Sequence, residues 1–136
     1  MKLKLTVLSS FALLISMIFC VQASAQQKDG PDLMQQAEDE ADRLARILDL
    51  EDWQDFYVDS TLKHDFPAMI ADYEKLQTSK VTNTALYQSV QDKWMDQIDA
   101  TYKKIFNEQQ WAAYLKSGAA KAQKAREKRK AKAAGK

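Results

Sequence analysis

The chain has 136 residues, of which 46% are hydrophobic and 29% charged, with a formal net charge of +1. That length accommodates one small domain. Three Gly and two Pro are too few for the tight turns of a β-sandwich or β-barrel, or for a glycine-rich phosphate loop. One His and one Cys argue against a cysteine protease, a zinc finger or a multi-histidine metal centre. Composition therefore favours a small helical binding protein over an enzyme, with no metal and no cofactor.

Residues 1–25 have the pattern of a secretory signal peptide. Lys2 and Lys4 precede an almost wholly apolar run, which ends in the small residues Ala-Ser-Ala. We therefore expect cleavage after Ala25 and a periplasmic protein. An uncleaved membrane anchor is the alternative, because the apolar run approaches the length that spans a bilayer. Cys20 leaves with the signal peptide, so the mature chain has no disulfide.

The next segments predict helices. Pro31 suits a first helical position, and small or apolar residues recur at steps of three and four up to residue 48, which predicts a helix over 31–48. A second helix is predicted over 50–63. Asp65 and Pro67 then predict a break, because Asp65 can cap a new helix and Pro67 fits its first turn. A third, separate helix is therefore expected to begin there.

The rest of the body continues the pattern. Residues 78–84 are polar and unpatterned, which predicts a loop, and an apolar stripe predicts a long helix over 84–106. A short helix is predicted over 108–117, ended by Gly118. The predicted fold is all-α, with four to five helices in a thin, extended or curved layer. Because such a layer buries little apolar surface by itself, we expect a homodimer.

Charge divides the mature chain. Residues 26–115 hold 9 basic and 18 acidic residues, a net charge of −9, whereas residues 116–136 hold 9 basic and one acidic residue, a net charge of +8. We therefore separate a helical domain, 26–117, from a basic Ala/Lys-rich tail, 118–136.

Three interpretations of the tail stay open. It could serve solubility, it could bind anionic lipid or lipopolysaccharide, or it could lie on the acidic body and shield it. The predicted signal peptide argues against nucleic acid as a partner. The cations that would serve an anionic surface are Lys121, Lys124, Arg126, Lys128, Arg129, Lys130 and Lys132.

Two short segments resemble each other, because a large apolar residue precedes a Gln by four positions in both: Leu50 with Gln54, and Phe106 with Gln110. In the second segment, Asn107 is expected to cap a helix and Gln110 to reach back to its amide, which is a capping box.

In the first segment the expected cap differs. Glu51 is a poor capping residue, so Asp49 with Asp52 is expected to cap one register earlier.

This pair resembles the LTxxQ motif of the Spy/CpxP family of periplasmic proteins, although Glu51 replaces the Thr of the first motif. The resemblance covers about residues 42–116 and is carried by Leu50, Gln54, Phe106, Asn107 and Gln110. It implies a thin, curved, dimeric helical cradle. Members of the family include an ATP-independent chaperone, an inhibitor of an envelope stress sensor, and zinc-binding relatives.

Eleven aromatic residues lie between positions 53 and 114. They could form the core, or a thin layer could leave some of them exposed to hold unfolded proteins. The candidates for client binding are Trp53, Phe56, Tyr57, Phe66, Met69, Tyr73, Trp94 and Tyr102. The sequence therefore predicts a non-catalytic chaperone or stress-response protein that binds unfolded or envelope proteins. The alternatives are an adaptor or sensor-inhibitor with one specific partner, and a binder of the anionic envelope surface.

Overall fold

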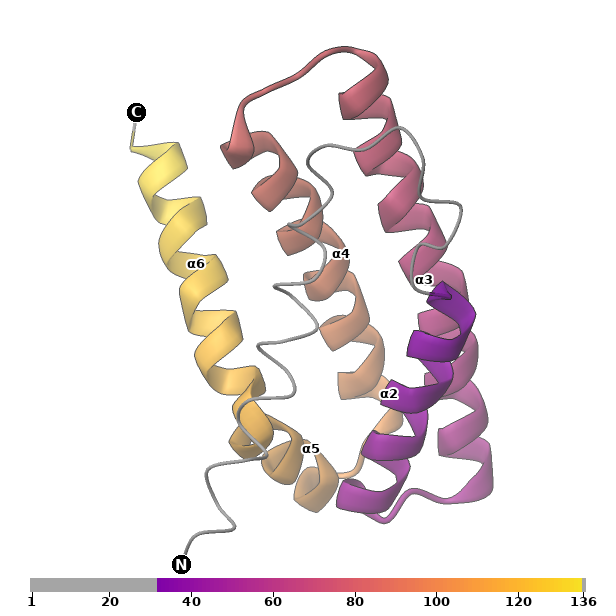
Figure 1. Ribbon diagram of the computed structural model, residues 1–136. Coiled ribbons are helices and arrows are strands. Elements are labelled where there is room, and N and C mark those ends of the chain that lie inside the picture. Colours follow the sequence, from indigo (N-terminus) through magenta and orange to yellow (C-terminus); the bar gives the residue numbers. More distant parts are fainter. Residues whose placement is uncertain (1–31, 136) are drawn as a thin grey trace, which may run out of the picture.

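The computed structural model describes residues 32–135, which are helical apart from short connections and contain no strand (Figure 1). The all-α prediction is confirmed. The elements are α2 (Leu33–Leu48), α3 (Asp52–Thr78), α4 (Thr84–Ile105), α5 (Glu108–Tyr114), η1 (Leu115–Ala119) and α6 (Ala120–Ala134). The predicted signal peptide lies outside the described residues. Within them, no helix combines the length and the apolar character needed to cross a membrane.

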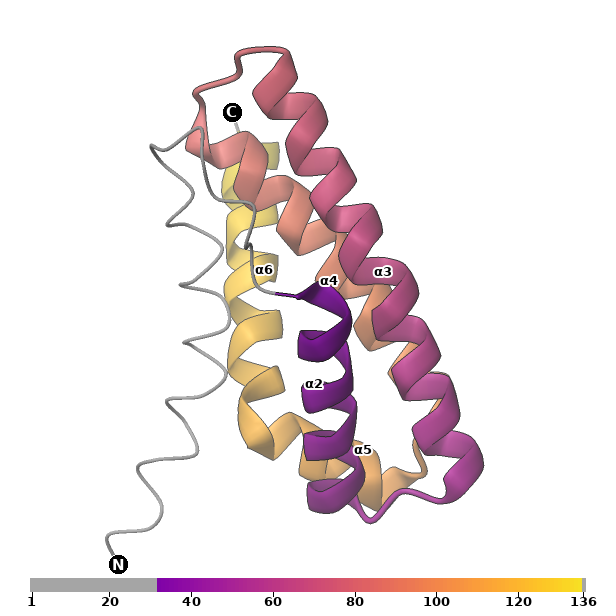
Figure 2. The same cartoon turned by 45° about the vertical axis from the view of Figure 1, so that its right-hand side comes forward.

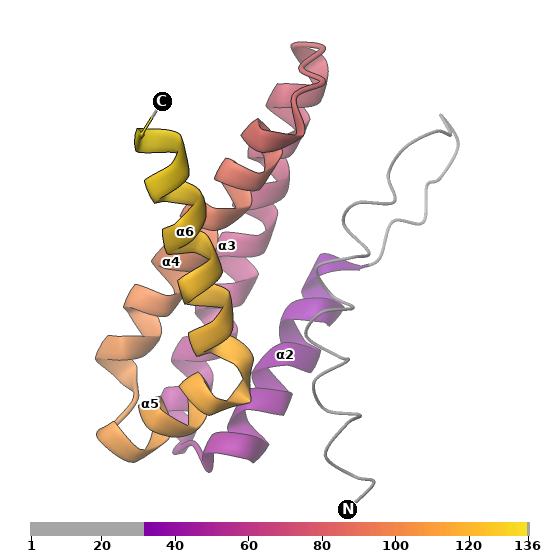
Figure 3. The same cartoon turned by 90° about the vertical axis from the view of Figure 1, so that its left-hand side faces the viewer.

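Three long helices lie side by side. α3 and α4 form an antiparallel hairpin, and α6 runs antiparallel to α4 on the side away from α3 (Figure 1). α2 packs against the first half of α3, and its N-terminal end diverges from the other helices (Figure 3). α5 crosses the end of the molecule where α2, α3 and α4 meet (Figure 2). The core therefore lies at that end of the layer.

The core is built from small and large apolar residues of four helices. α2 contributes its predicted stripe, and rings from α4 and α5 fill the space beneath it. The buried members are Ala37, Ala41, Leu44, Leu48, Val58, Leu62, Ile98, Tyr102, Phe106, Tyr114 and Ala119. Small alanines in α2 let its backbone approach α3 closely, so the helix can be short and still exclude water from large neighbours.

The predicted helix break at Pro67 is wrong, because α3 is one helix from Asp52 to Thr78 with Pro67 inside it. Asp65 is buried within this helix and caps nothing. An internal proline removes one backbone hydrogen bond and costs about 3 kcal/mol. Packing outweighs this cost, because α3 buries Leu62 before the proline and Met69 after it.

The other helix ends follow local chemistry. Asp32 caps α2 by accepting from the Met34 amide at 3.0 Å, and Asn83 caps α4 by accepting from the Ala85 amide at 3.0 Å. The predicted loop before α4 is confirmed and spans residues 79–83. Gly118 has φ of 120°, a conformation that favours glycine, and it redirects the chain from α5 into α6.

Candidate binding surfaces

The two motif glutamines form a reciprocal pair, although 56 residues separate them. Gln54 Nε2 donates to Gln110 Oε1 at 2.7 Å, and Gln110 Nε2 donates to Gln54 Oε1 at 2.9 Å. Both side chains are buried. Because buried amides need hydrogen-bond partners, this glutamine pair ties the start of α3 to the start of α5. The sequence analysis found both residues but not their contact.

Each glutamine also completes the cap of its own helix. Gln110 Oε1 accepts from the Asn107 amide at 3.0 Å, and Asn107 Oδ1 accepts from the Gln110 amide at 2.9 Å, so the predicted capping box of α5 is confirmed. Gln54 Oε1 accepts from the Glu51 amide at 3.0 Å. The predicted cap at Asp49 is wrong, because Asp49 ends α2 in a left-handed conformation and Glu51 is the residue before α3.

The glutamine pair further joins the connections that precede the two helices. Gln54 Nε2 donates to the Ile105 carbonyl at 2.9 Å, and Gln110 Nε2 donates to the Asp49 carbonyl at 3.4 Å. Each acceptor lies two residues before the N-cap of the opposite helix. Leu50 is half-buried against the core and Phe106 is buried within it. The two motifs therefore form one structural unit with an approximate twofold relation.

Three of the eight predicted client-binding residues are exposed at the start of α3. The exposed fractions are 50% for Trp53, 66% for Phe56 and 54% for Tyr57. Tyr57 contacts the other two rings edge-to-face, with centroid distances of 6.3 Å to Trp53 and 5.7 Å to Phe56. These three residues are called the aromatic patch below.

The other five candidates lie elsewhere. Met69, Tyr73 and Tyr102 are buried, so they offer no surface to a client and that expectation is wrong for them. Phe66 and Trp94 are half-buried. The Trp94 indole Nε1 donates a hydrogen bond to the Asp72 carboxylate at 2.9 Å. Of the eleven rings between positions 53 and 114, four are buried, four are half-buried and three are exposed, and the three exposed rings all lie at the start of α3.

Helical spacing explains why the patch stands out from α3. Positions 53, 56 and 57 share one face of a helix, whereas Gln54 and Val58 lie on another face and are buried. Because Gln54 is tied to Gln110 and Ile105, the first turn of α3 is anchored on its inner side. The rings on its outer side are therefore held on a rigid support.

Acidic groups lie at the start of α3, beside the aromatic patch. Glu51 accepts from the Trp53 indole at 2.6 Å, and Asp52 follows it in the first turn of the helix. Asp55 lies on the opposite face of that turn, where burial and the repulsion of neighbouring carboxylates, first that of Asp42, raise its pKa. The carboxylates of Glu51 and Asp52 suit an apolar segment that carries positive charges.

A second polar region joins α6 to α4. Arg129 forms a two-pronged ion pair with Asp92, with both distances 2.7 Å. Arg126 is buried and pairs with Asp96 at 2.7 Å and with Asp99, and Lys130 also pairs with Asp96. These contacts are called the charged interface. Arg126, Arg129 and Lys130 therefore lie on the acidic body, as in the interpretation that the tail shields it.

The remaining four basic candidates face away from α4. Lys121, Lys124, Lys128 and Lys132 are exposed, and within residues 32–135 none of them forms an ion pair. The acidic partners Asp92, Asp96 and Asp99 escaped the sequence analysis. These carboxylates are four and three residues apart, which places them on one face of α4. The same helical spacing relates Arg126 to Arg129 and Lys130, and this match could have indicated the contact between the two helices.

Two buried tyrosines lie between the charged interface and the apolar core. Tyr114 donates to Asp99 at 2.6 Å, and burial, with the adjacent Asp99 carboxylate, raises the Tyr114 pKa. Burial also raises the pKa of Tyr102, whose hydroxyl has no hydrogen-bond partner in the described part of the chain. Both phenols therefore stay neutral and bury polar atoms next to charged groups.

No group of three or more His, Cys, Asp and Glu within residues 32–135 is arranged to hold a metal ion. Comparisons with protein-family models, with curated proteins and with solved structures found no match to this chain. The aromatic patch and the outer face of α6 are the two candidate binding surfaces in the described part of the chain.

Proposed function

We propose that the protein is a periplasmic, ATP-independent chaperone or stress-response protein that binds exposed apolar segments of other polypeptides at the aromatic patch. The observation that carries the proposal is the presence of three adjacent rings, each at least half exposed, on one turn of α3. Burying such a ring from water contributes about 1.5–3 kcal/mol. A client segment that covers the patch would recover that energy without any chemical step.

The rigidity of the support favours binding over accidental exposure. Aromatic side chains lose little conformational entropy on contact because they have two rotatable angles, and the Trp53 ring is already held by Glu51. The backbone beneath is fixed by the glutamine pair. The acidic surroundings select clients whose apolar residues stand beside Lys or Arg, because opposite charges speed encounter and suppress wrong partners.

The test compares two triple variants in suppressing the aggregation of a chemically denatured enzyme. Trp53→Ser, Phe56→Ser and Tyr57→Ser together remove the patch. The matched control replaces the other exposed large apolar residues by Ser, namely Met34, Ile47 and Leu86, whose exposed fractions are 47%, 43% and 45%. We expect the patch variant to lose suppression and the control to keep it. Equal activity of wild type and patch variant would refute the proposal.

An adaptor with one specific partner is the second candidate, and the small size of the patch favours it over a broad cradle. Three unrelated denatured enzymes distinguish the two functions. Suppression of aggregation of all three supports the chaperone. Binding restricted to a single native envelope protein, lost in the patch variant, supports the adaptor. The expected homodimer stays a prediction, and a mass by light scattering that changes between wild type and patch variant would identify the patch as the contact between two copies.

A further inference from the structure

The outer face of α6 carries a regular row of positive charge. Lys121, Lys124, Lys128 and Lys132 follow one another at steps of three, four and four residues. Residues at these steps lie on one face of a helix. The row covers about 17 Å at a rise of 1.5 Å per residue, and all four side chains are exposed. These four residues are called the lysine stripe.

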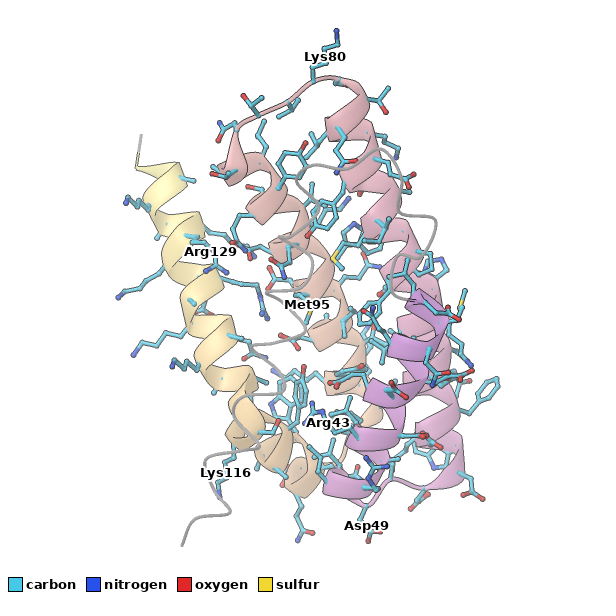
Figure 4. All side chains as sticks on the ribbon, viewed as in Figure 1. Arg43, Asp49, Lys80, Met95, Lys116 and Arg129 are labelled. Atoms are coloured by element: carbon cyan, nitrogen blue, oxygen red, sulfur yellow. The ribbon has the colours of Figure 1, made fainter. Side chains whose placement is uncertain are left out.

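The side of α6 that faces α4 uses different cations. Gln123 and Arg126 bind Asp99, and Arg129, labelled in Figure 4 between α6 and α4, binds Asp92. Seen along the helix axis, where each residue advances by about 100°, Gln123 and Arg126 lie opposite the lysine stripe, and Arg129 lies about a quarter turn from it. Docking of α6 on the body therefore leaves the lysine stripe unneutralised.

We propose that the lysine stripe is a docking surface for an anionic lipid bilayer. α6 lies at the edge of the layer, with α4 between it and α3 (Figure 1), so no other helix of residues 32–135 lies between the stripe and an approaching planar surface. Each lysine near such a surface raises the partition coefficient about fivefold. α6 has no large apolar residue in Ala120–Ala134, so it lies on the headgroups and does not insert.

The chemistry of the stripe favours a membrane over a nucleic acid. Arginine forks and aromatic stacking provide much of the recognition of bases and phosphates. Both arginines of α6 are engaged by carboxylates of α4, and α6 contains no aromatic residue. A straight row of lysines, each a flexible point charge, matches instead a planar array of headgroups whose positions are not fixed.

This inference does not depend on the proposed function, because the aromatic patch and the lysine stripe lie on helices separated by α4 (Figure 1). A membrane bound at α6 leaves the start of α3 free to bind a client. The expected result is a binding protein held at an anionic surface.

The test uses co-sedimentation of the mature chain, residues 26–136, with vesicles of phosphatidylglycerol and phosphatidylcholine, with vesicles of phosphatidylcholine alone as the reference. The stripe variant replaces the four lysines by Gln. The matched control replaces four exposed lysines on other elements by Gln, namely Lys80, Lys93, Lys103 and Lys104, so both variants have the same net charge. Far-UV circular dichroism checks that both stay helical.

We expect binding of the wild type to the anionic vesicles only, a loss of roughly 600-fold in the stripe variant at about fivefold per lysine, and a much smaller loss in the control. Binding of the wild type should also fall steeply at about 0.5 M salt, where screening acts within roughly 4 Å. Equal losses in the two variants, or equal binding to neutral vesicles, would overturn the proposal. So would a preference for a duplex oligonucleotide over the anionic vesicles that is lost in the stripe variant.

Discussion

Two faces of α4 are stabilised by different forces. Near its C-terminus, Ile98 and Tyr102 pack against α2, α3 and α5 in an apolar core. Along its other face, Asp92, Asp96 and Asp99 hold α6 through ion pairs and hydrogen bonds. Apolar burial is insensitive to salt and non-directional, whereas ion pairs depend on geometry, pH and ionic strength.

This difference shows how a helix without large apolar residues can join a fold. α6 buries only Arg126 along its length, yet it lies in a defined register on α4. Directional charge pairs provide that register, because Arg126, Arg129 and Lys130 each have a carboxylate of α4 at matched spacing. Five variants test this comparison, in order of decreasing expected effect.

Leu44→Ala tests the apolar core. Leu44 is fully buried, and a buried Leu replaced by Ala costs about 2–5 kcal/mol of unfolding free energy. Urea denaturation should show this loss equally at low and high salt. Ile47→Ala is the control in the same helix, since Ile47 is 43% exposed and should change stability by less than about 1 kcal/mol. A salt-dependent loss for Leu44→Ala would contradict the assignment.

Gln110→Ala tests the glutamine pair. The change removes both hydrogen bonds between the two glutamines and leaves the Asn107 backbone amide without its partner, and we expect a loss of about 2–3 kcal/mol. Gln109→Ala, an exposed neighbour on α5, is the control. In a double-mutant cycle with Gln54→Ala, the combined loss should be clearly less than the sum of the single losses. Additive losses would argue against a direct contact.

Two tyrosine variants separate a satisfied hydroxyl from an unsatisfied one. Tyr114→Phe removes the hydrogen bond to Asp99 and should cost about 1–3 kcal/mol. Tyr102→Phe removes a buried hydroxyl that has no partner in the described residues, so it should leave stability unchanged or slightly raised. Thermal unfolding of both variants measures the difference. Similar losses would show that Tyr102 makes a hydrogen bond in solution.

Asp96→Asn tests the charged interface with the smallest expected effect. Burial opposes ionisation of Asp96, but hydrogen bonds from Lys130 and Arg126 outweigh burial and lower its pKa below 3.8. A lowered pKa contributes stability above the unfolded value, and this stability is lost as pH falls through the folded value. The free energy of unfolding, measured by urea denaturation, should be higher for the wild type than for the variant by up to about 1 kcal/mol near neutral pH. The two values should converge well below pH 3.8. A difference that persists in acid would contradict the ion-pair role.

The predictability of this fold differed between elements. The stripe of α2, the loop before α4 and the capping box of α5 depend on residues close in sequence, so periodicity and capping rules found them. α3 was predicted as two helices, because Pro67 and Asp65 are local helix-breaking and capping signals and the packing that overrides them comes from distant elements. The same limit applied to the aromatic candidates, because the exposure of Phe56 and the burial of Tyr73 depend on which helix covers them.

Residue type and spacing along one helix were enough to establish the helical class, the apolar stripes, the capping box of α5 and the division between an acidic body and a basic tail. Only the tertiary structure decided that Gln54 meets Gln110 and that the α6 cations divide into a clamped set and an exposed set. Those outcomes depend on how helices dock, and docking is selected by contacts between residues far apart in the chain. The physical reason is that the residue type alone sets which hydrogen bonds a side chain can make. Its actual partner and its exposure to water depend on which helices pack against it.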